Sequence, residues 1–298
     1  MSIDIHTPAR GSVGPGCYQR PGTVHTLTVD DVRISTVPDG YIRVPPRTWL
    51  PDAPPEYWAA NPHFLDQDGA LVVSICALLV EHRDSGRALL IDAGVALPSS
   101  QTPYGTMRGG ALLSGLAALG RSPADIEAVV ITHLHADHLG WLWLPAPDGH
   151  PFAHARVYVG EREWAARREV SHRHGIPPEI LDSFAPQVVT VTHGHQIWPE
   201  VEITELPGHS IGHLGVTITL GLRTLIVLGD AMTSPCQISH PEWGTVSDHH
   251  PAQATVSRRR LIAELVRPYV LAYAGHFADA QVGEVVPAGL DGYRWRPL

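Results

Sequence analysis

The sequence has few cysteines, no long apolar run and few clustered basic residues. Its longest apolar stretch, residues 71–80, is interrupted by Ser74 and is too short to cross a bilayer. The three cysteines are far apart in the chain, which argues against a disulfide framework and indicates a reducing compartment. The first 17 residues contain no apolar segment of the secretory type. We therefore expect a cytoplasmic protein with no membrane association.

The charge pattern argues against a nucleic-acid partner. The formal net charge is −9, and the 21 basic residues are spread along the chain. The single dense basic cluster, residues 258–260, falls in an expected helix, where we interpret it as a solvated face. A hydrophobic content of 44% and a charged content of 17% are typical of a folded globular chain. A length of 298 residues allows one large domain or two small ones.

A cluster of ligand-type side chains follows the apolar, β-branched run Ala128–Ile131. Residues 132–138 read THLHADH. Because residues two apart on an extended backbone point the same way, His133 and His135 can reach one metal ion together. Asp137 and His138 face elsewhere as the chain turns, and they can hold a second ion. Imidazole and carboxylate groups are ligands for zinc and similar ions, so the pattern favours a metal site over a solvated loop.

Three more strand ends carry residues of the same kind. The motif PGHSIGH, residues 207–213, follows the strand expected over 201–206. Gly229-Asp230 follows an apolar run at 225–228, and Gly275-His276 follows another at 270–274. Glycine next to each ligand-type residue lets the backbone turn sharply and approach an ion. Together these residues supply the ligands that a two-metal site still needs.

The remaining pattern predicts two sheets packed together with helices outside. Residues 1–70 are expected to form an arm and strap, packed either on the body of the chain or between the subunits of a homodimer. Residues 71–298 are expected to form the catalytic domain. The many prolines of residues 38–68 argue against regular structure there. Asp92 directly follows an apolar strand, and we expect it either to brace the backbone near the metal loop or to cap a turn.

In the order HLHADH, PGHSIGH, GD and GH, the chain from about residue 71 onward resembles the metallo-β-lactamase superfamily. The resemblance implies an αββα sandwich with metal ions at the sheet edges. It further implies that one ion is held by three histidines, that a second is held by an aspartate and two histidines, and that an aspartate bridges both. The residues so implied are His133, His135 and His209; Asp137, His138 and His276; and Asp230.

The end of the chain, with HPEW at 240–243 and GYRW at 292–295, resembles the branch that holds quorum-quenching lactonases and methyl parathion hydrolase. Typical members of the lactonase group carry a tyrosine three residues after the bridging aspartate. This chain has Thr233 there, which moves the expectation toward the parathion-hydrolase-like members. The candidate catalytic residues are Asp230 and Asp137, and the candidate pocket residues are Trp141, Thr233, Trp243 and Phe277.

We therefore expect a dinuclear, zinc-dependent hydrolase. A metal-bridging hydroxide, oriented by Asp230, would cleave an ester or lactone bond of a small and largely uncharged substrate. The alternatives are a phosphotriester hydrolase and, further off, a thioesterase, a β-lactamase or a mononuclear iron dioxygenase. A metal-stabilised binding protein is disfavoured, because structural sites are usually closed by four ligands and seven candidates are present.

Overall fold

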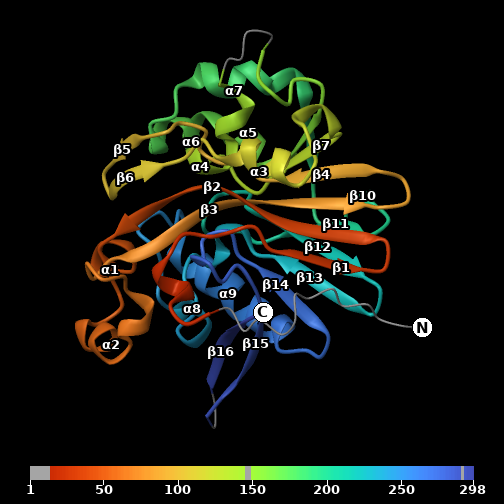
Figure 1. Ribbon diagram of the computed structural model, residues 1–298. Coiled ribbons are helices and arrows are strands. Elements are labelled where there is room, and N and C mark those ends of the chain that lie inside the picture. Colours follow the sequence, from red (N-terminus) through yellow and green to blue (C-terminus); the bar gives the residue numbers. More distant parts are fainter. Residues whose placement is uncertain (1–13, 145–148, 290–291) are drawn as a thin grey trace.

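The computed structural model describes residues 14–144, 149–289 and 292–298. Two β-sheets pack face to face and helices cover both outer faces, so the expected αββα sandwich is confirmed (Figure 1). Residues 1–13, the first part of the expected arm, lie outside the described residues. Within the described ranges, no helix combines the length and the apolar character needed to span a membrane.

The first sheet contains nine of the described strands, in the order β5-β6-β2-β3-β4-β7-β8-β9, with β1 paired to β2. Strands β4, β7, β8 and β9 run parallel, and β2 and β3 form a long antiparallel pair. The strands are β1 (Thr26–Val29), β2 (Val32–Val44), β3 (Leu71–His82), β4 (Arg87–Ile91), β5 (Ser100–Thr102), β6 (Gly105–Arg108), β7 (Ala128–Ile131), β8 (Arg156–Gly160) and β9 (Val188–Val191).

The second sheet contains seven strands in the order β10 to β16. All of its pairs are antiparallel except β13 with β14, which are joined through a long helical crossover. The strands are β10 (Gln196–Trp198), β11 (Val201–Glu205), β12 (Leu214–Leu220), β13 (Arg223–Val227), β14 (Val270–Tyr273), β15 (Val282–Ala288) and β16 (Gly292–Pro297).

The helices form the two outer layers and a peripheral N-terminal group. Helices α3 to α7 lie over the first sheet, and α8 and α9 lie against the second (Figure 1). The helices are α1 (Pro46–Trp49), α2 (Pro55–Ala60), α3 (Leu112–Ala118), α4 (Ala136–Leu139), α5 (Glu161–Ala165), α6 (Arg167–His174), α7 (Pro178–Phe184), α8 (Cys236–Ser239) and α9 (Pro251–Leu265).

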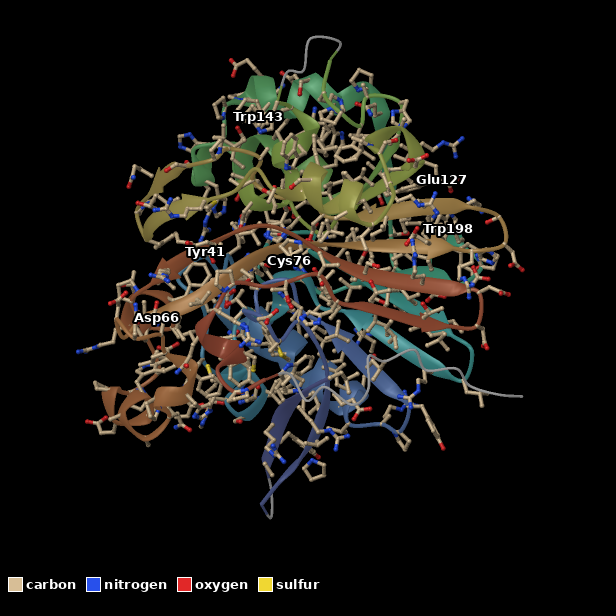
Figure 2. All side chains as sticks on the ribbon, viewed as in Figure 1. Tyr41, Asp66, Cys76, Glu127, Trp143 and Trp198 are labelled. Atoms are coloured by element: carbon tan, nitrogen blue, oxygen red, sulfur yellow. The ribbon has the colours of Figure 1, made fainter. Side chains whose placement is uncertain are left out.

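The core between the sheets is built from strand residues that alternate inward. Leu78, Val80 and Ile91 of the first sheet pack against Val216 and Leu225 of the second, and all five are almost completely buried. Cys76 lies in this same core, near the middle of the molecule (Figure 2). Because burial disfavours the thiolate, the pKa of Cys76 is raised to about 12. All three cysteines are buried and free, as expected for a chain without disulfides.

A polar contact joins the two sheets. The Trp198 indole of β10 donates to a Glu127 carboxylate oxygen at 2.8 Å, just before β7 begins. The guanidinium of Arg87 binds the same carboxylate and lies over the Trp198 ring. In the view of Figure 2, Glu127 and Trp198 lie on the opposite side of the molecule from Asp66 of the N-terminal region.

The N-terminal region is less separate than the sequence indicated. Strand β2 pairs with β3 from Val32 to Val44, so part of the expected arm lies inside the first sheet. The prolines did not prevent this, because Pro38 sits at a register shift where the strand bulges. Residues 46–64 form short helices rather than irregular strap, and several of these helices begin with proline at the first helical position.

Candidate metal centre

The HLHADH segment starts where β7 ends. His135 has an extended backbone and precedes α4, whereas Asp137 and His138 lie within that short helix. The change from strand to helix directs the first two histidines and the following pair to different points, as the spacing predicted. The chain is held in this path by Asp92, whose carboxylate accepts hydrogen bonds from the Thr132 amide and from the Thr132 hydroxyl. The bracing role expected of Asp92 is therefore confirmed.

The structure brings all seven predicted ligand residues together from four loops. One group contains His133, His135, His209 and Asp230, and the other contains Asp137, His138 and His276. Within each group, one ligand-type atom from every residue lies within 4.8 Å of the others. All but Asp137 are buried. A cluster of this composition suits divalent metal ions such as zinc.

Asp230 lies between the two groups. Its Oδ1 atom is 3.0 Å from Nε2 of His276 and 3.4 Å from Nε2 of His138. Its Oδ2 atom is 3.4 Å from Nε2 of His209 and 3.8 Å from Nε2 of His133. Nε2 of His276 is also 3.1 Å from Oδ2, so it contacts both oxygens. One carboxylate thus faces both groups.

The backbone around Asp230 is tightly packed. Gly229 has a φ of 50°, and a Cβ atom there would lie 2.5 Å from Nε2 of His213. That same His213 nitrogen accepts a hydrogen bond from the Asp230 amide at 2.9 Å. His213, the last residue of PGHSIGH, therefore supports the backbone of Asp230, and it belongs to neither ligand group.

In each of the five histidines, one ring nitrogen is bound to a neighbour and the other faces the cluster. Nδ1 of His138 is 2.9 Å from Asp92, and Nδ1 of His209 is 3.0 Å from Asp248. Such outer contacts select the tautomer of a metal-binding imidazole and orient its ring. The remaining contacts are Nδ1 of His133 with Thr132 Oγ1 (3.0 Å), Nδ1 of His276 with Ser74 O (2.5 Å) and Nε2 of His135 with His174 Nε2 (3.0 Å).

Two of the nitrogens that face the cluster have no hydrogen-bond partner among the described residues. They are Nε2 of His133 and Nε2 of His138, one in each group, and both are buried. A buried polar atom without a partner is costly, so such atoms call for an explanation. Coordination to a cation in each group would satisfy both nitrogens. On this observation the residues fit a pair of divalent ions.

The electrostatics of the two groups differ. Burial and the neighbouring imidazoles lower the pKa of His133 and His135 well below 6.5, so both rings are neutral donors of a lone pair. Burial also disfavours the charged form of His138, but Asp230, Asp92 and Asp137 outweigh it and raise its pKa. His276 and His138 in turn lower the pKa of Asp230, against the effect of burial. Three carboxylates therefore surround His138, and their negative charge attracts a cation.

A family model for the metallo-beta-lactamase superfamily matches residues 72–276, which run from β3 to the last predicted ligand. The chain belongs to the metallo-beta-lactamase superfamily. The mouse protein "Metallo-beta-lactamase domain-containing protein 1" is 28% identical over 211 residues, which cover 68% of each chain. Membership and the His/Asp cluster together support a metal-dependent hydrolase.

Solved structures of the superfamily share the fold. AidC, described as a dizinc quorum-quenching lactonase, superposes with a TM-score of 0.80 at 22% identity, covering 94% of this chain and 98% of its own. The hydrolase AbOPH superposes with a TM-score of 0.79 at 23% identity, and the match covers 93% of this chain and 98% of the AbOPH chain. At these identities the likeness establishes the superfamily's fold for nearly the whole chain.

Within this superfamily fold, several residues that sequence reasoning missed support the ligand loops. Glu163 of α5 is fully buried and accepts hydrogen bonds from the Leu134 amide and from Ser210 and Gly212. It therefore ties the HLHADH loop to the PGHSIGH loop. His174, at the end of α6, contacts the outer nitrogen of His135. Neither residue stands in a motif, and only the packing of the helical layer on the loops reveals them.

Asp248 and Arg258 were also missed. Asp248 lies in a loop, and its carboxylate binds His209. Burial raises the pKa of Asp248, but His209 and Arg258 outweigh burial, so that the pKa is lowered. Arg258 was expected on a solvated face together with its neighbours. That expectation was wrong for this residue, because its side chain is fully buried in an ion pair with Asp248. Of the three arginines, only Arg259 and Arg260 are exposed to solvent.

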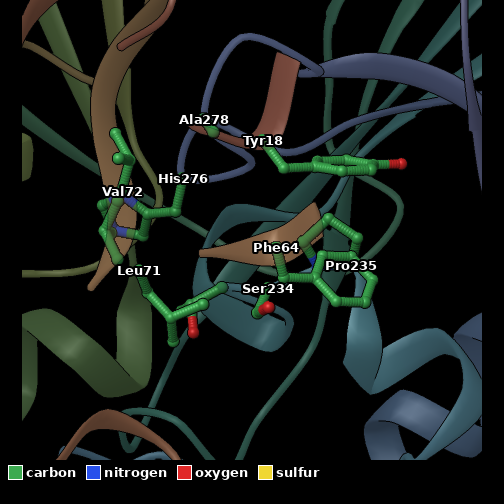
Figure 3. A pocket seen from close by; sticks show the side chains of 10 residues that line it. Tyr18, Phe64, Leu71, Val72, Ser234, Pro235, His276 and Ala278 are labelled. Carbon is green, nitrogen blue, oxygen red and sulfur yellow. The ribbon is translucent and has the colours of Figure 1, made fainter. Parts of the chain in front are cut away.

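A pocket lies beside the second ligand group. His276 and Val72 lie on one side, and the rings of Tyr18 and Phe64 lie on the other (Figure 3). Thr233, one of the predicted pocket residues, also lines it, and its hydroxyl accepts a hydrogen bond from the Trp49 indole at 3.0 Å. The N-terminal region thus contributes to the wall of the pocket.

The other three predicted pocket residues lie elsewhere. Phe277 is fully buried and packs edge-on against Trp295, so it cannot form a wall of this pocket. Trp243 is also buried, stacks on His240 and packs with the N-terminal cluster. Trp141 packs in the helical layer and donates its indole N–H to Asp39. Proximity in sequence to the ligand loops was a poor guide, because successive loop residues point in different directions.

Proposed function

We propose that this chain is a dinuclear metal-dependent hydrolase that cleaves an ester or lactone bond in a small, largely uncharged substrate. The observation that carries the proposal is a single buried carboxylate, Asp230, between two groups of ligand-type residues, with an apolar pocket beside His276. We assign His133, His135 and His209 to one ion and Asp137, His138 and His276 to the other, with Asp230 shared. The ions are proposed to be zinc.

A pair of bound divalent ions would supply Lewis-acid polarisation of the scissile carbonyl and a water of lowered pKa. The chain's own residues provide the rest. The outer contacts of the imidazoles hold their ring planes, and Asp92 holds the loop that carries His133. Asp230 would accept a proton at a carboxylate oxygen and orient the attacking group. Asp137, whose side chain is 19% exposed and is the one residue of the set that is not buried, is proposed as a second catalytic carboxylate at the open side.

The pocket lining supports an uncharged and partly apolar substrate. Its ten lining residues include no Lys, Arg, Asp or Glu, and most are apolar. A carboxylate or phosphate group on the substrate would need a guanidinium or ammonium partner that this wall does not offer. An alkyl or aryl group would be removed from water against Tyr18, Phe64 and Leu71. AidC and other lactonases of this fold bind acyl-homoserine products, and the proposal extends that substrate size to this chain.

A phosphotriester is the second candidate, and Thr233 favours it. Lactonases of the resembling branch carry tyrosine at this step, and the Thr233 hydroxyl is too short to occupy the same space. The hydroxyl is also fixed, because its oxygen accepts the Trp49 indole N–H. Its own O–H remains able to donate to the phosphoryl oxygen of a phosphotriester.

The test combines metal analysis with a substrate screen. Purified protein should contain about two divalent ions per chain, as two-metal hydrolases require. Zinc-loaded protein should hydrolyse lactones or aryl esters, with phosphotriesters and thioesters as the comparison set. A neutral ester and its analogue with a distal carboxylate, compared by kcat/KM at two ionic strengths, test the charge of the substrate. A single iron with oxygen consumption, or a salt-sensitive preference for the anionic ester, would contradict the proposal.

A further inference from the structure

Asp248 and Arg258 form an ion pair that is completely shielded from solvent. Asp248 lies in the loop before α9, and Arg258 lies within that helix. Both side chains have zero exposure, and Nη1 of Arg258 is 3.1 Å from Oδ2 of Asp248. Burying two charges costs more than burying apolar residues of the same size unless their hydrogen bonds are all made. A pair in this position therefore calls for a role beyond stability.

The Asp248 carboxylate connects the guanidinium to a predicted metal ligand. Its Oδ1 atom accepts from Nδ1 of His209 at 3.0 Å, and its Oδ2 atom accepts from Arg258. Thr245 adds two donors, its amide and its hydroxyl, so the carboxylate is fully engaged. The other nitrogens of Arg258 are bound to Pro241 O at 2.7 Å and Thr255 Oγ1 at 3.2 Å.

This arrangement determines the direction and tautomer of His209. Because Nδ1 of His209 donates to Asp248, its lone pair lies on Nε2, which faces His135 and Asp230. The loop backbone adds a second restraint, since the amides of His249 and His250 donate to the carbonyls of His209 and Gly208. Helix α9 thus reaches the metal cluster through a chain of three side chains.

We propose that Asp248 and Arg258 are positioning residues that set the affinity of one metal position, the one made by His133, His135 and His209. The inference rests on the proposed metal sites and not on the reaction. The second position has separate support, because His138 is held by Asp92 and His276 by the Ser74 carbonyl. Loss of the Asp248–Arg258 pair should therefore weaken one position and spare the other.

The test measures zinc binding directly, by competition with a chromophoric chelator. Asp248→Asn keeps the side-chain shape but removes its charge, and it places an amide N–H₂ or a weaker acceptor toward Arg258. Outer-shell substitutions of this kind typically weaken metal binding by about 10- to 100-fold, and we expect that loss at one of the two positions. Arg258→Met should show the same selective loss. Arg258→Lys retains the charge but not the planar fork, and it should give an intermediate affinity.

Glu81→Gln is the matched control. Glu81 is a buried carboxylate on β3 held by Arg33 and Arg121, and it lies about 23 Å along the strand from Ser74 at the usual rise per residue. Its loss should lower the unfolding temperature while both zinc affinities stay unchanged. The inference is overturned if Asp248→Asn binds two ions as tightly as the wild type, or if both positions weaken equally. If Arg258→Met fails to fold, Asp248→Asn and Arg258→Lys decide the question.

Failure of the proposed metal sites would look different. A wild-type chain that binds fewer than two zinc ions would overturn the two-metal assignment, and this inference with it. A wild-type chain that binds two ions, with unchanged affinities in the variants, would overturn the positioning role alone.

Discussion

Asp279 fastens the N-terminal segment to the loop that follows His276. Its carboxylate accepts from Nε of Arg20 at 2.7 Å and from both the amide and the hydroxyl of Thr23 at 2.8 Å. Nε2 of His25 lies 3.0 Å away. Burial opposes ionisation, but these donors outweigh it and lower the pKa of Asp279 from 3.8 to about 2. The contact matters for the pocket, because Tyr18 on the same segment forms part of its wall.

The size of the effect follows from that pKa. A depression from 3.8 to about 2 is equivalent to about 2.5 kcal/mol of differential stabilisation of the carboxylate. Arg20 and His25 are 44% and 42% exposed, so solvent screening reduces the contribution to about 1–2 kcal/mol. Because the folded-state pKa lies below the unfolded one, this stability is present above about pH 4 and is lost as the pH falls toward 2.

The perturbation is Asp279→Asn, measured by urea unfolding at equal metal content. At pH 7 the variant should lose about 1–2 kcal/mol of unfolding free energy, and by pH 3 the difference should fall to about half. Asp182→Asn, which breaks an exposed pair with Arg168, is the control and should cost less than about 1 kcal/mol. A loss no larger than in the control, or the same loss at pH 3 as at pH 7, would refute the reasoning.

Three further outcomes are expected. Asp230→Asn should retain the fold but lower turnover by about 10²- to 10⁴-fold, because the asparagine cannot accept a proton. Activity near wild type with both metals bound would exclude Asp230 as the proton acceptor. Phe64→Ala should lower kcat/KM for esters with long apolar groups more than for acetyl esters, and a parallel fall for both would show that the pocket is not the binding wall. Trp243→Ala should lower the free energy of unfolding, measured by chemical denaturation, by about 3 kcal/mol, because the ring is buried. Leu222→Ala, at an exposed position, is the control and should leave the free energy of unfolding almost unchanged.

Local patterns along the chain predicted the strands that precede the ligand loops and a helix that contains residues 258–260. A local signal is also present at Ser122, whose side chain and backbone form a capping box with Asp125. Sequence patterns failed where pairing is long-range. Strand β2 continues through Pro38 because β3 pairs with it. The sequence of the β15–β16 hairpin has no clear alternation of apolar and polar residues from which the hairpin could be predicted. Pairing partners that are distant in sequence can override local propensity.

The sequence by itself determined which residues could bind metal, because ligand chemistry and spacing are local properties. HLHADH after a buried strand, and glycine beside each later ligand, were readable without a structure. Only the tertiary structure decided what surrounds those ligands. The outer contacts to Asp248, Glu163 and His174 join elements far apart in the chain, and burial of Arg258 depends on the loop that covers it. Charges are placed by three-dimensional packing, since the cost of burying them depends on which partners fold beside them.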